Sequence, residues 1–155
     1  MMLIYSIMIY FDTDVIIHYL VDQDSVKHHQ ANQLFQDASK NQNFFCSLLC
    51  LQEAAYVLSG LKVPDTCIEA AMRELLTPEI VNYTADDYKR AIQLSRKTGF
   101  QNINDCLHTA LAESYCNEFY TYNSSDFKKI QNYTDLKITI FKPYLNKGYS
   151  RCIGS

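Results

Sequence analysis

The chain alternates between short continuous apolar runs and longer segments in which apolar residues recur every three or four positions. The opening run, residues 3–11, has no polar alternation, which predicts a strand buried on both faces. Shorter runs predict further strands at residues 43–47, 80–83, 118–122 and 137–141. The helical periodicity between the runs predicts helices at residues 14–21, 25–39, 48–58, 65–76, 84–98 and 105–116.

Capping residues support the predicted ends of several helices. Four side chains stand where an oxygen can accept a hydrogen bond from a free backbone N–H of the first turn: Ser25, Ser47, Thr84 and Asn104. Gly60 and Gly99 are expected just past the ends of two helices. Strands that alternate with helices predict an α/β fold, a three-layer α/β/α sandwich with a mostly parallel central sheet of four to five strands. The length predicts a single domain over residues 1–155.

Composition narrows the class of protein. The chain has 155 residues, of which 48% are hydrophobic and 20% charged, and its net charge is −3, so no global attraction to nucleic acid or membrane is expected. The opening run lacks a basic flank and is too short to span a bilayer, which predicts a cytoplasmic protein without a membrane segment. The six cysteines are scattered, and only Cys46 and Cys50 are closely spaced. We therefore expect reduced thiols rather than disulfides or a zinc site.

Polar side chains fall at the carboxyl ends of predicted strands or in the helices that follow them: Asp12, Asp14, Glu53, Asp105, Asn123 and Asp126. In a parallel sheet these ends share one edge, where ligands bind. Taken singly, Asp12 or Asp14 fits a helix cap equally well, Asp105 fits a first-turn acid, and Asp126 fits a turn. Glu53 is different because its neighbours along the helix face are apolar, and a carboxylate there needs a partner.

Several carboxylates in one cleft predict a bound cation. Two of them at about 4 Å repel by roughly 4 kcal/mol at an effective dielectric constant of about 20. A set of oxygen ligands favours Mg²⁺ or Mn²⁺ over Zn²⁺. Such an ion activates water and neutralises phosphate charge, so the pattern indicates phosphate chemistry.

Four segments resemble those of PIN-domain proteins, and among these the VapC-type toxin ribonucleases of toxin–antitoxin pairs. They are "YFDTDVIIHYL", "SLLCLQEAAYVLSGL", "INDCLHTALAES" and "FYTYNSSDF", and they occur in that family's order and spacing. The resemblance implies hydrolysis of RNA phosphodiester bonds by water activated by Mg²⁺ or Mn²⁺, leaving a 5′-phosphate. It also implies a small antitoxin as partner and a homodimer, for which the apolar helices at residues 14–21 and 48–58 are candidate contact surfaces.

Carried over by position, the resemblance implies that Asp12, Glu53 and Asp105 form the acidic core of the metal site. The fourth member is Asn123 or Asp126, with Asp126 preferred if an acid is required. Thr13 is expected to orient Asp12.

The sequence departs from the family's pattern at two positions. Asp14 stands where Asn is common, and Tyr122 stands where a basic residue is common. Possible RNA phosphate contacts are the basic residues Lys27, Arg96, Lys97, Lys128 and Lys129. His108, one turn after Asp105, is a candidate to lie near the site.

Two other functions fit parts of the pattern. "FDTDV" is similar to the start of haloacid-dehalogenase-type phosphatases, but the paired acids Asp86 and Asp87 open a helix at the wrong place for that family. Alternatively, the PIN-like fold serves as a binding module with a weakened site. A binding module is expected to lack a tight site for Mg²⁺ or Mn²⁺.

Overall fold

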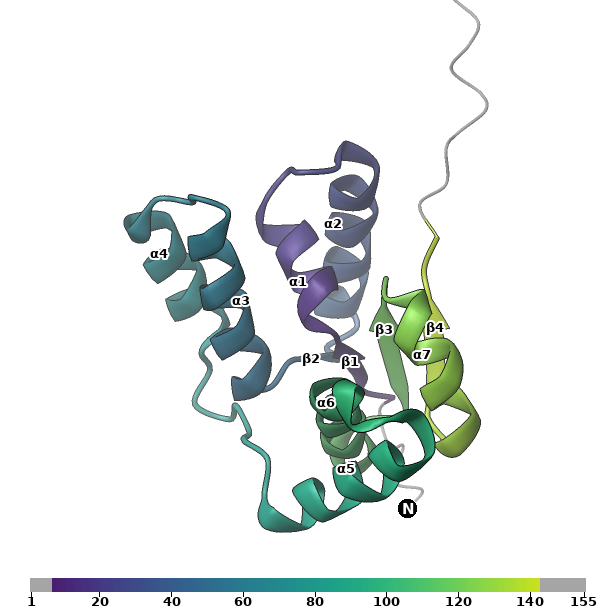
Figure 1. Ribbon diagram of the computed structural model, residues 1–155. Coiled ribbons are helices and arrows are strands. Elements are labelled where there is room, and N and C mark those ends of the chain that lie inside the picture. The colour runs from purple at the N-terminus through teal and green to yellow at the C-terminus, as the bar shows by residue number, and fades with distance from the viewer. Residues whose placement is uncertain (1–6, 143–155) are drawn as a thin grey trace, which may run out of the picture.

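A parallel sheet forms the centre of the protein in a computed structural model, which describes residues 7–142 (Figure 1). Within that range the sheet has four strands, all parallel to their neighbours, in the order β2-β1-β3-β4. The strands are β1 (Ile9–Phe11), β2 (Phe44–Phe45), β3 (Glu118–Thr121) and β4 (Lys137–Ile140). The predicted α/β fold with a parallel sheet of four to five strands is confirmed.

The helices follow the predicted order, with one addition. They are α1 (Thr13–Leu20), α2 (Ser25–Lys40), α3 (Leu48–Gly60), α4 (Asp65–Leu75), α5 (Ala85–Thr98), α6 (Ile103–Tyr115) and α7 (Ser124–Ile130). The addition is α7, whose seven residues are too few to show helical periodicity in the sequence. None of the helices within residues 7–142 is long and apolar enough to cross a membrane.

The predicted caps are confirmed at two helices and wrong at two. The Ser47 hydroxyl accepts a hydrogen bond from the Cys50 N–H, and Thr84 forms a capping box with Asp87. The cap of α2 is Asp24 rather than Ser25, because the longer reach of its carboxylate satisfies two backbone N–H groups. Asn104 does not cap α6, because a 3-10 turn over Phe100–Asn102 leads directly into that helix.

Several predicted boundaries change, most by one or two residues, and three of the changes affect how the elements are described. The predicted strand at residues 80–83 is reduced to an isolated bridge between Val81 and Ser47, since no sheet strand lies beside the rest of it. Gly60 is the last residue of α3 rather than the residue past its end, whereas Gly99 does follow α5, with a φ of 103°. β1 begins at Ile9, and residues 3–6 of the predicted opening strand lie outside the described residues.

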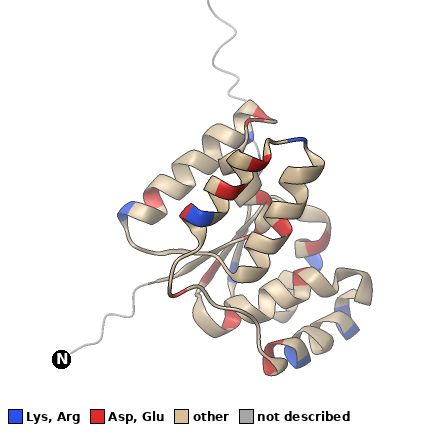
Figure 2. Ribbon diagram, turned by 90° about the vertical axis from the view of Figure 1, so that its left-hand side faces the viewer, with Lys and Arg blue, Asp and Glu red and all other residues tan. Residues whose placement is uncertain are grey.

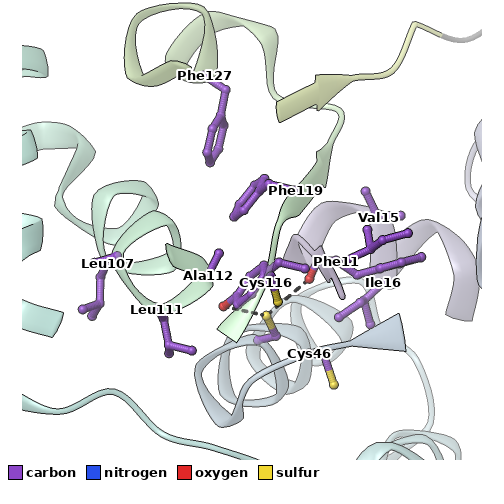
Figure 3. Close-up of a cluster of buried hydrophobic side chains, with 14 of the residues drawn as sticks. Phe11, Val15, Ile16, Cys46, Leu107, Leu111, Ala112, Cys116, Phe119 and Phe127 are labelled. Atoms are coloured by element: carbon purple, nitrogen blue, oxygen red, sulfur yellow. Dashed lines mark hydrogen bonds between the residues drawn. The ribbon is translucent and has the colours of Figure 1, made fainter. Parts of the chain in front are cut away.

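Aromatic contacts show that helices cover both faces of the sheet. On one face Tyr10 stacks on Phe119 with ring centroids 5.0 Å apart, and Phe119 contacts Phe127 of α7. Figure 3 shows Phe119 and Phe127 pointing toward each other. On the opposite face Phe44 of β2 contacts Phe11, 4.8 Å away, and Phe35 of α2. Each fully buried ring contributes about 2 kcal/mol of hydrophobic free energy, so the three-layer sandwich is held from both sides.

The thiols agree with the expectation of free cysteines. Cys46, Cys50, Cys106 and Cys116 are buried thiols and Cys67 is an exposed one. Cys152 lies outside the described residues.

Strand order places a crevice between β1 and β3. The chain leaves β1 to form β2 on one side, and after β2 it crosses to form β3 on the other side of β1. Parallel sheets bind ligands where the connections diverge in this way, outside the carboxyl ends of the strands. Asp12 follows β1 directly, and its N–H donates to the carbonyl of Tyr120 in β3 over 3.0 Å.

Candidate active site

A cleft of about 730 Å³ opens at the carboxyl ends of β1 and β3. Its lining includes six of the side chains singled out from the sequence: Asp12, Thr13, Asp14, Glu53, Asp105 and Asn123. They come from the end of β1, from α1, α3 and α6, and from the turn before α7. The fold therefore brings together residues that lie up to 111 positions apart, from Asp12 to Asn123.

Asp12 is both a helix cap and part of the cleft. Its side chain precedes α1, and Oδ1 accepts a hydrogen bond from the Thr13 N–H over 2.8 Å. Oδ2 accepts one from the Thr121 hydroxyl over 2.7 Å. Asp12 is only 5% exposed, and this burial raises its pKa, although His108 and the two hydrogen bonds oppose the rise. The two alternatives for Asp12, a cap or a site residue, are compatible.

Asp14 joins the start of α1 to the end of β3. Its carboxylate accepts a hydrogen bond from the Tyr122 N–H over 3.1 Å. Burial and the nearby charge of Asp12 raise the pKa of Asp14 well above its usual value. The extra charge that Asp14 adds to the cleft is therefore costly without a cation.

Glu53 has the partners that the sequence argument required. Its Oε2 accepts hydrogen bonds from the Thr13 hydroxyl over 2.8 Å and from Nε2 of His108 over 2.9 Å. Burial opposes ionisation of Glu53, but the bonds and charge of His108 and Thr13 outweigh burial and lower its pKa. Thr13 contacts Asp12 through its N–H and Glu53 through its hydroxyl, so it links two of the acids.

Asp105 lies in the first turn of α6, as predicted, in a different environment. Burial and the negative charge of Asp12 raise the pKa of Asp105 to about 7, with a further contribution from Asp126. The Asn123 amide nitrogen is 3.5 Å from Oδ2 of Asp105, a long hydrogen bond. Asp105 is therefore about half protonated at pH 7 unless a cation is bound.

Asn123 and Asp126 have different positions. Asn123 lines the cleft, and its side-chain oxygen caps α7 by accepting a hydrogen bond from the Asp126 N–H over 3.3 Å. The Asn123 amide nitrogen donates to Oδ2 of Asp126 over 2.9 Å. Asp126 does not line the cleft. Asn123 thus lies on the lining of the cleft, whereas Asp126 lies off the lining and close to Asp105.

The chemistry of these donors fits a hard divalent cation. The cleft presents the carboxylates of Asp12, Glu53 and Asp105, and such oxygens are the preferred ligands of Mg²⁺ and Mn²⁺. Asn123 also lines the cleft, although its amide oxygen already accepts hydrogen bonds from the Asp126 N–H and the Ser125 hydroxyl. Burial is the main cause of the raised pKa values of Asp12, Asp14 and Asp105, and neighbouring negative charge adds to each rise. In residues 7–142, no three acidic, histidine or cysteine side chains are already spaced as a metal site.

The basic residues singled out from the sequence do not line the cleft. Lys27 is the one tied to a residue beside it: its ammonium group lies 5.5 Å from the ring centre of Tyr122, whose hydroxyl donates to the Lys27 carbonyl. The other four are exposed in the last turns of α5 and α7: Arg96, Lys97, Lys128 and Lys129. Figure 2 shows basic segments interspersed among acidic ones along the ribbon.

Sequence reasoning missed part of the support for the cleft. Thr121 is buried at the end of β3, donates to Asp12, and accepts a hydrogen bond from the Asn123 N–H over 3.0 Å. A hydroxyl residue that ends a strand beside a predicted site is the signal for such a role. Ser47 was predicted only as a helix cap and Tyr10 only as part of an apolar run, yet their buried hydroxyls bond each other over 2.7 Å.

The fold and sequence were compared with those of known proteins. A family model described as PIN domain matches residues 9–132. Among solved structures, a chain in the crystal structure of VapBC2 from Rickettsia felis, bound to a DNA fragment from their promoter, is similar with a TM-score of 0.63. The two chains are 19% identical, and the match covers 87% of this chain and 100% of that one. No curated protein sequence gives a significant match.

Proposed function

The chain belongs to the PIN domain family, and from that premise we propose that it is a metal-dependent endoribonuclease and the toxin of a toxin–antitoxin pair. PIN domains are generally nucleases. The observation that carries the proposal is the cleft itself, in which Asp12, Glu53 and Asp105 come from three separate elements to one crevice of a parallel sheet. A structural role for any one of these acids would not require the other two beside it.

In this proposal the cation is held by Asp12, Glu53 and Asp105, with Asn123 or Asp126 as the fourth residue. The position of Asn123 on the cleft lining favours Asn123 as the contact and Asp126 as the residue that orients it. When bound, Mg²⁺ or Mn²⁺ supplies an activated water and neutralises charge on the scissile phosphate. Thr13 and Thr121 hold the acids in place by hydrogen bonds.

RNA is the proposed substrate, and its phosphates need positive charge that the acidic cleft lacks. Lys27 is the best-placed basic side chain, because it packs on Tyr122 near the cleft. Tyr56, 83% exposed on the cleft lining, offers a ring for an unstacked base. With so few basic contacts, affinity for RNA is expected to depend strongly on the bound cation.

The proposed partner is a small antitoxin protein, in line with the similar structure, which is a complex named VapBC2. Exposed apolar side chains offer contact area beside the cleft: Tyr56 and Val57 on α3, and Leu61 directly after that helix. A partner bound there would block access to the acids. We also propose that the protein forms a homodimer.

The test is cleavage of a mixed RNA pool by the purified protein with Mg²⁺, with Mn²⁺ and with EDTA. Metal-dependent cleavage that is lost in Asp12→Asn and Asp105→Asn is expected. The matched control is Asp86→Asn, which removes an exposed acid on α5 away from the cleft and should leave cleavage unchanged. If no condition gives cleavage and Mn²⁺ does not bind, a binding module replaces the nuclease as the better proposal.

A further inference from the structure

A chain of buried polar side chains runs beneath the cleft and ends at Glu53. The hydroxyls of Ser47 and Tyr10 are 2.7 Å apart, and the Tyr10 hydroxyl is 2.7 Å from Nδ1 of His108. Nε2 of His108 is 2.9 Å from Oε2 of Glu53. Ser47 and Tyr10 are fully buried and His108 is 1% exposed, so of these four residues only Glu53 reaches the cleft.

The direction of the hydrogen bonds fixes that Nε2 of His108, the nitrogen facing Glu53, carries a proton. An ionised carboxylate only accepts, so Nε2 of His108 must donate. With a neutral ring, Nδ1 accepts from Tyr10, which accepts from Ser47. With a charged ring, Nδ1 donates to Tyr10, which donates to Ser47. In both states Nε2–H donates to Glu53, so this contact does not depend on the protonation of His108.

The members of the chain are anchored on rigid parts of the fold. Tyr10 lies in the central strand and stacks on Phe119 at an interplanar angle of 5°. His108 lies within α6 and contacts the edge of the Tyr10 ring. Ser47 caps α3, the helix that carries Glu53. Because a buried polar group without a partner is costly, each member restrains the next one.

Cys50 suggests a different use of His108, which its burial excludes. Its sulfur lies 3.8 Å from Nδ1 of His108, so Cys50, His108 and Glu53 are arranged like a thiol nucleophile, a base and an orienting acid. However, Cys50 is 0% exposed and its sulfur contacts the Phe11 carbonyl within the core. A substrate cannot reach this thiol, whereas Glu53 is open to the cleft.

We propose that His108 is a positioning residue that orients the Glu53 carboxylate and thereby sets the affinity of the cleft for a divalent cation. This inference rests on the proposed function. His108 and Thr13 both bind Oε2, while Oε1 makes no hydrogen bond to the residues that the structure describes. One oxygen is therefore held by the protein and the other is left for the cation. Partners of this kind typically strengthen metal affinity by about 10-fold to 100-fold.

The test compares the Mn²⁺ affinity of three variants with that of the unaltered full chain, by calorimetric titration, with thermal unfolding measured on each. His108→Leu removes both hydrogen bonds of the ring. His108→Gln keeps an N–H donor near the position of Nε2. Tyr10→Phe keeps the ring of His108 but removes the hydroxyl that holds it. Thr98→Val is the matched control, because Thr98 does not line the cleft and its buried hydroxyl in α5 bonds the Leu94 carbonyl and contacts the Cys106 sulfur.

The expected order of Mn²⁺ affinity separates positioning from folding. We expect His108→Leu to bind at least about 10-fold more weakly, Tyr10→Phe about 3-fold more weakly, and His108→Gln close to the unaltered chain. Thr98→Val should lose stability without losing affinity.

Two outcomes would overturn the proposal in distinguishable ways. Unchanged Mn²⁺ affinity in a folded His108→Leu protein would remove the role of His108 and leave the nuclease proposal intact. If His108→Leu does not fold, unchanged affinity in Tyr10→Phe has the same meaning. Absence of Mn²⁺ binding by the unaltered chain would remove both proposals together.

Discussion

Two acids on opposite walls of one cleft are held in opposite ways. Glu53, on α3, has one oxygen bonded by Thr13 and His108, and its pKa lies below the usual value although burial opposes this. Asp105, on α6, has one long contact from Asn123, and burial with the charge of Asp12 raises its pKa to about 7. The α3 wall, which carries Glu53, is ionised at neutral pH, whereas the α6 wall, which carries Asp105, is about half protonated at pH 7 in the absence of a cation.

The contrast between Glu53 and Asp105 shows how a fold can bring several carboxylates together without a permanent counter-charge. Only one of the two acids is balanced by the protein's own donors. The other, Asp105, is tolerated because its raised pKa leaves it about half neutral at pH 7 in the absence of a cation. Binding of a divalent ion would then release a proton from the α6 wall while leaving the α3 wall unchanged.

The largest expected effect comes from Asp12, whose charge acts on the α6 wall. Asp12→Asn keeps the side-chain shape but removes the charge that raises the pKa of Asp105. We expect cleavage of RNA to fall about 100-fold to 1000-fold. Carbon NMR titration should also show a lower pKa for Asp105. An unchanged Asp105 pKa would contradict this expectation, because burial alone would then explain the raised pKa of Asp105.

Charge removal on the two walls should change stability in opposite directions. The pKa of Asp105 is raised, so its native state binds more protons than the unfolded state between about pH 4 and 7, and its contribution to stability falls as pH rises through that window. Without metal at pH 8, Asp105→Asn should therefore gain about 2 kcal/mol.

Glu53→Gln is the matched partner of that variant. The pKa of Glu53 is lowered, so its contribution to stability is present above the unfolded pKa and is lost as pH falls through the lower native value. At pH 8 we expect a loss of about 1 kcal/mol. Urea denaturation in EDTA at pH 8 measures both changes, and changes of the same sign would contradict the comparison.

The pH dependence of cation binding should follow the α6 wall. Since Asp105 must lose its proton to bind a cation, Mn²⁺ affinity should rise by about 10-fold from pH 6 to pH 8 and level off above that. Calorimetric titration at several pH values measures this. In Asp105→Asn the rise should disappear, whereas a persisting rise would mean that Asp12 or Asp14 holds the exchangeable proton.

The smallest effect is expected from Asp126, which lies behind Asn123. Asp126→Asn should also lower the pKa of Asp105, because the charge and a side-chain hydrogen bond of Asp126 both raise it. Cleavage should fall only a few-fold if Asn123 is the residue that meets the cation, or about 100-fold if Asp126 meets it directly. The same NMR titration and cleavage assay decide between the two.

Local patterns were sufficient to predict most of the fold. A continuous run of apolar residues predicts the strand that ends just before Asp12. Capping chemistry predicts the starts of the helices capped by Ser47 and Thr84. The exceptions are short or depend on distant contacts. The segment around Val81 has strand-like residues but finds only the backbone of Ser47 and Leu48, and α7 is too short to show a pattern.

The acids of the candidate site could be predicted from the sequence, but the side chains that hydrogen-bond to them could not. An acid on the apolar face of α3 indicated that Glu53 needs a partner, but not that the partner is His108, 55 positions away. Tyr10 stands within an apolar run, where its ring predicts burial and its hydroxyl carries no signal. Its contact with His108 spans 98 positions, and only the folded chain brings the two together.

The all-parallel sheet has a consequence for the moment at which the cleft is completed. Within residues 7–142 no neighbouring strands are joined by a hairpin. The central strand β1 pairs with β3 far along the chain, and the hydrogen bond from Thr121 to Asp12 spans 109 positions. Folding that depends on such distant contacts is slow. During synthesis the lining of the cleft is complete only after Asn123 has emerged, so a shorter chain lacks part of that lining.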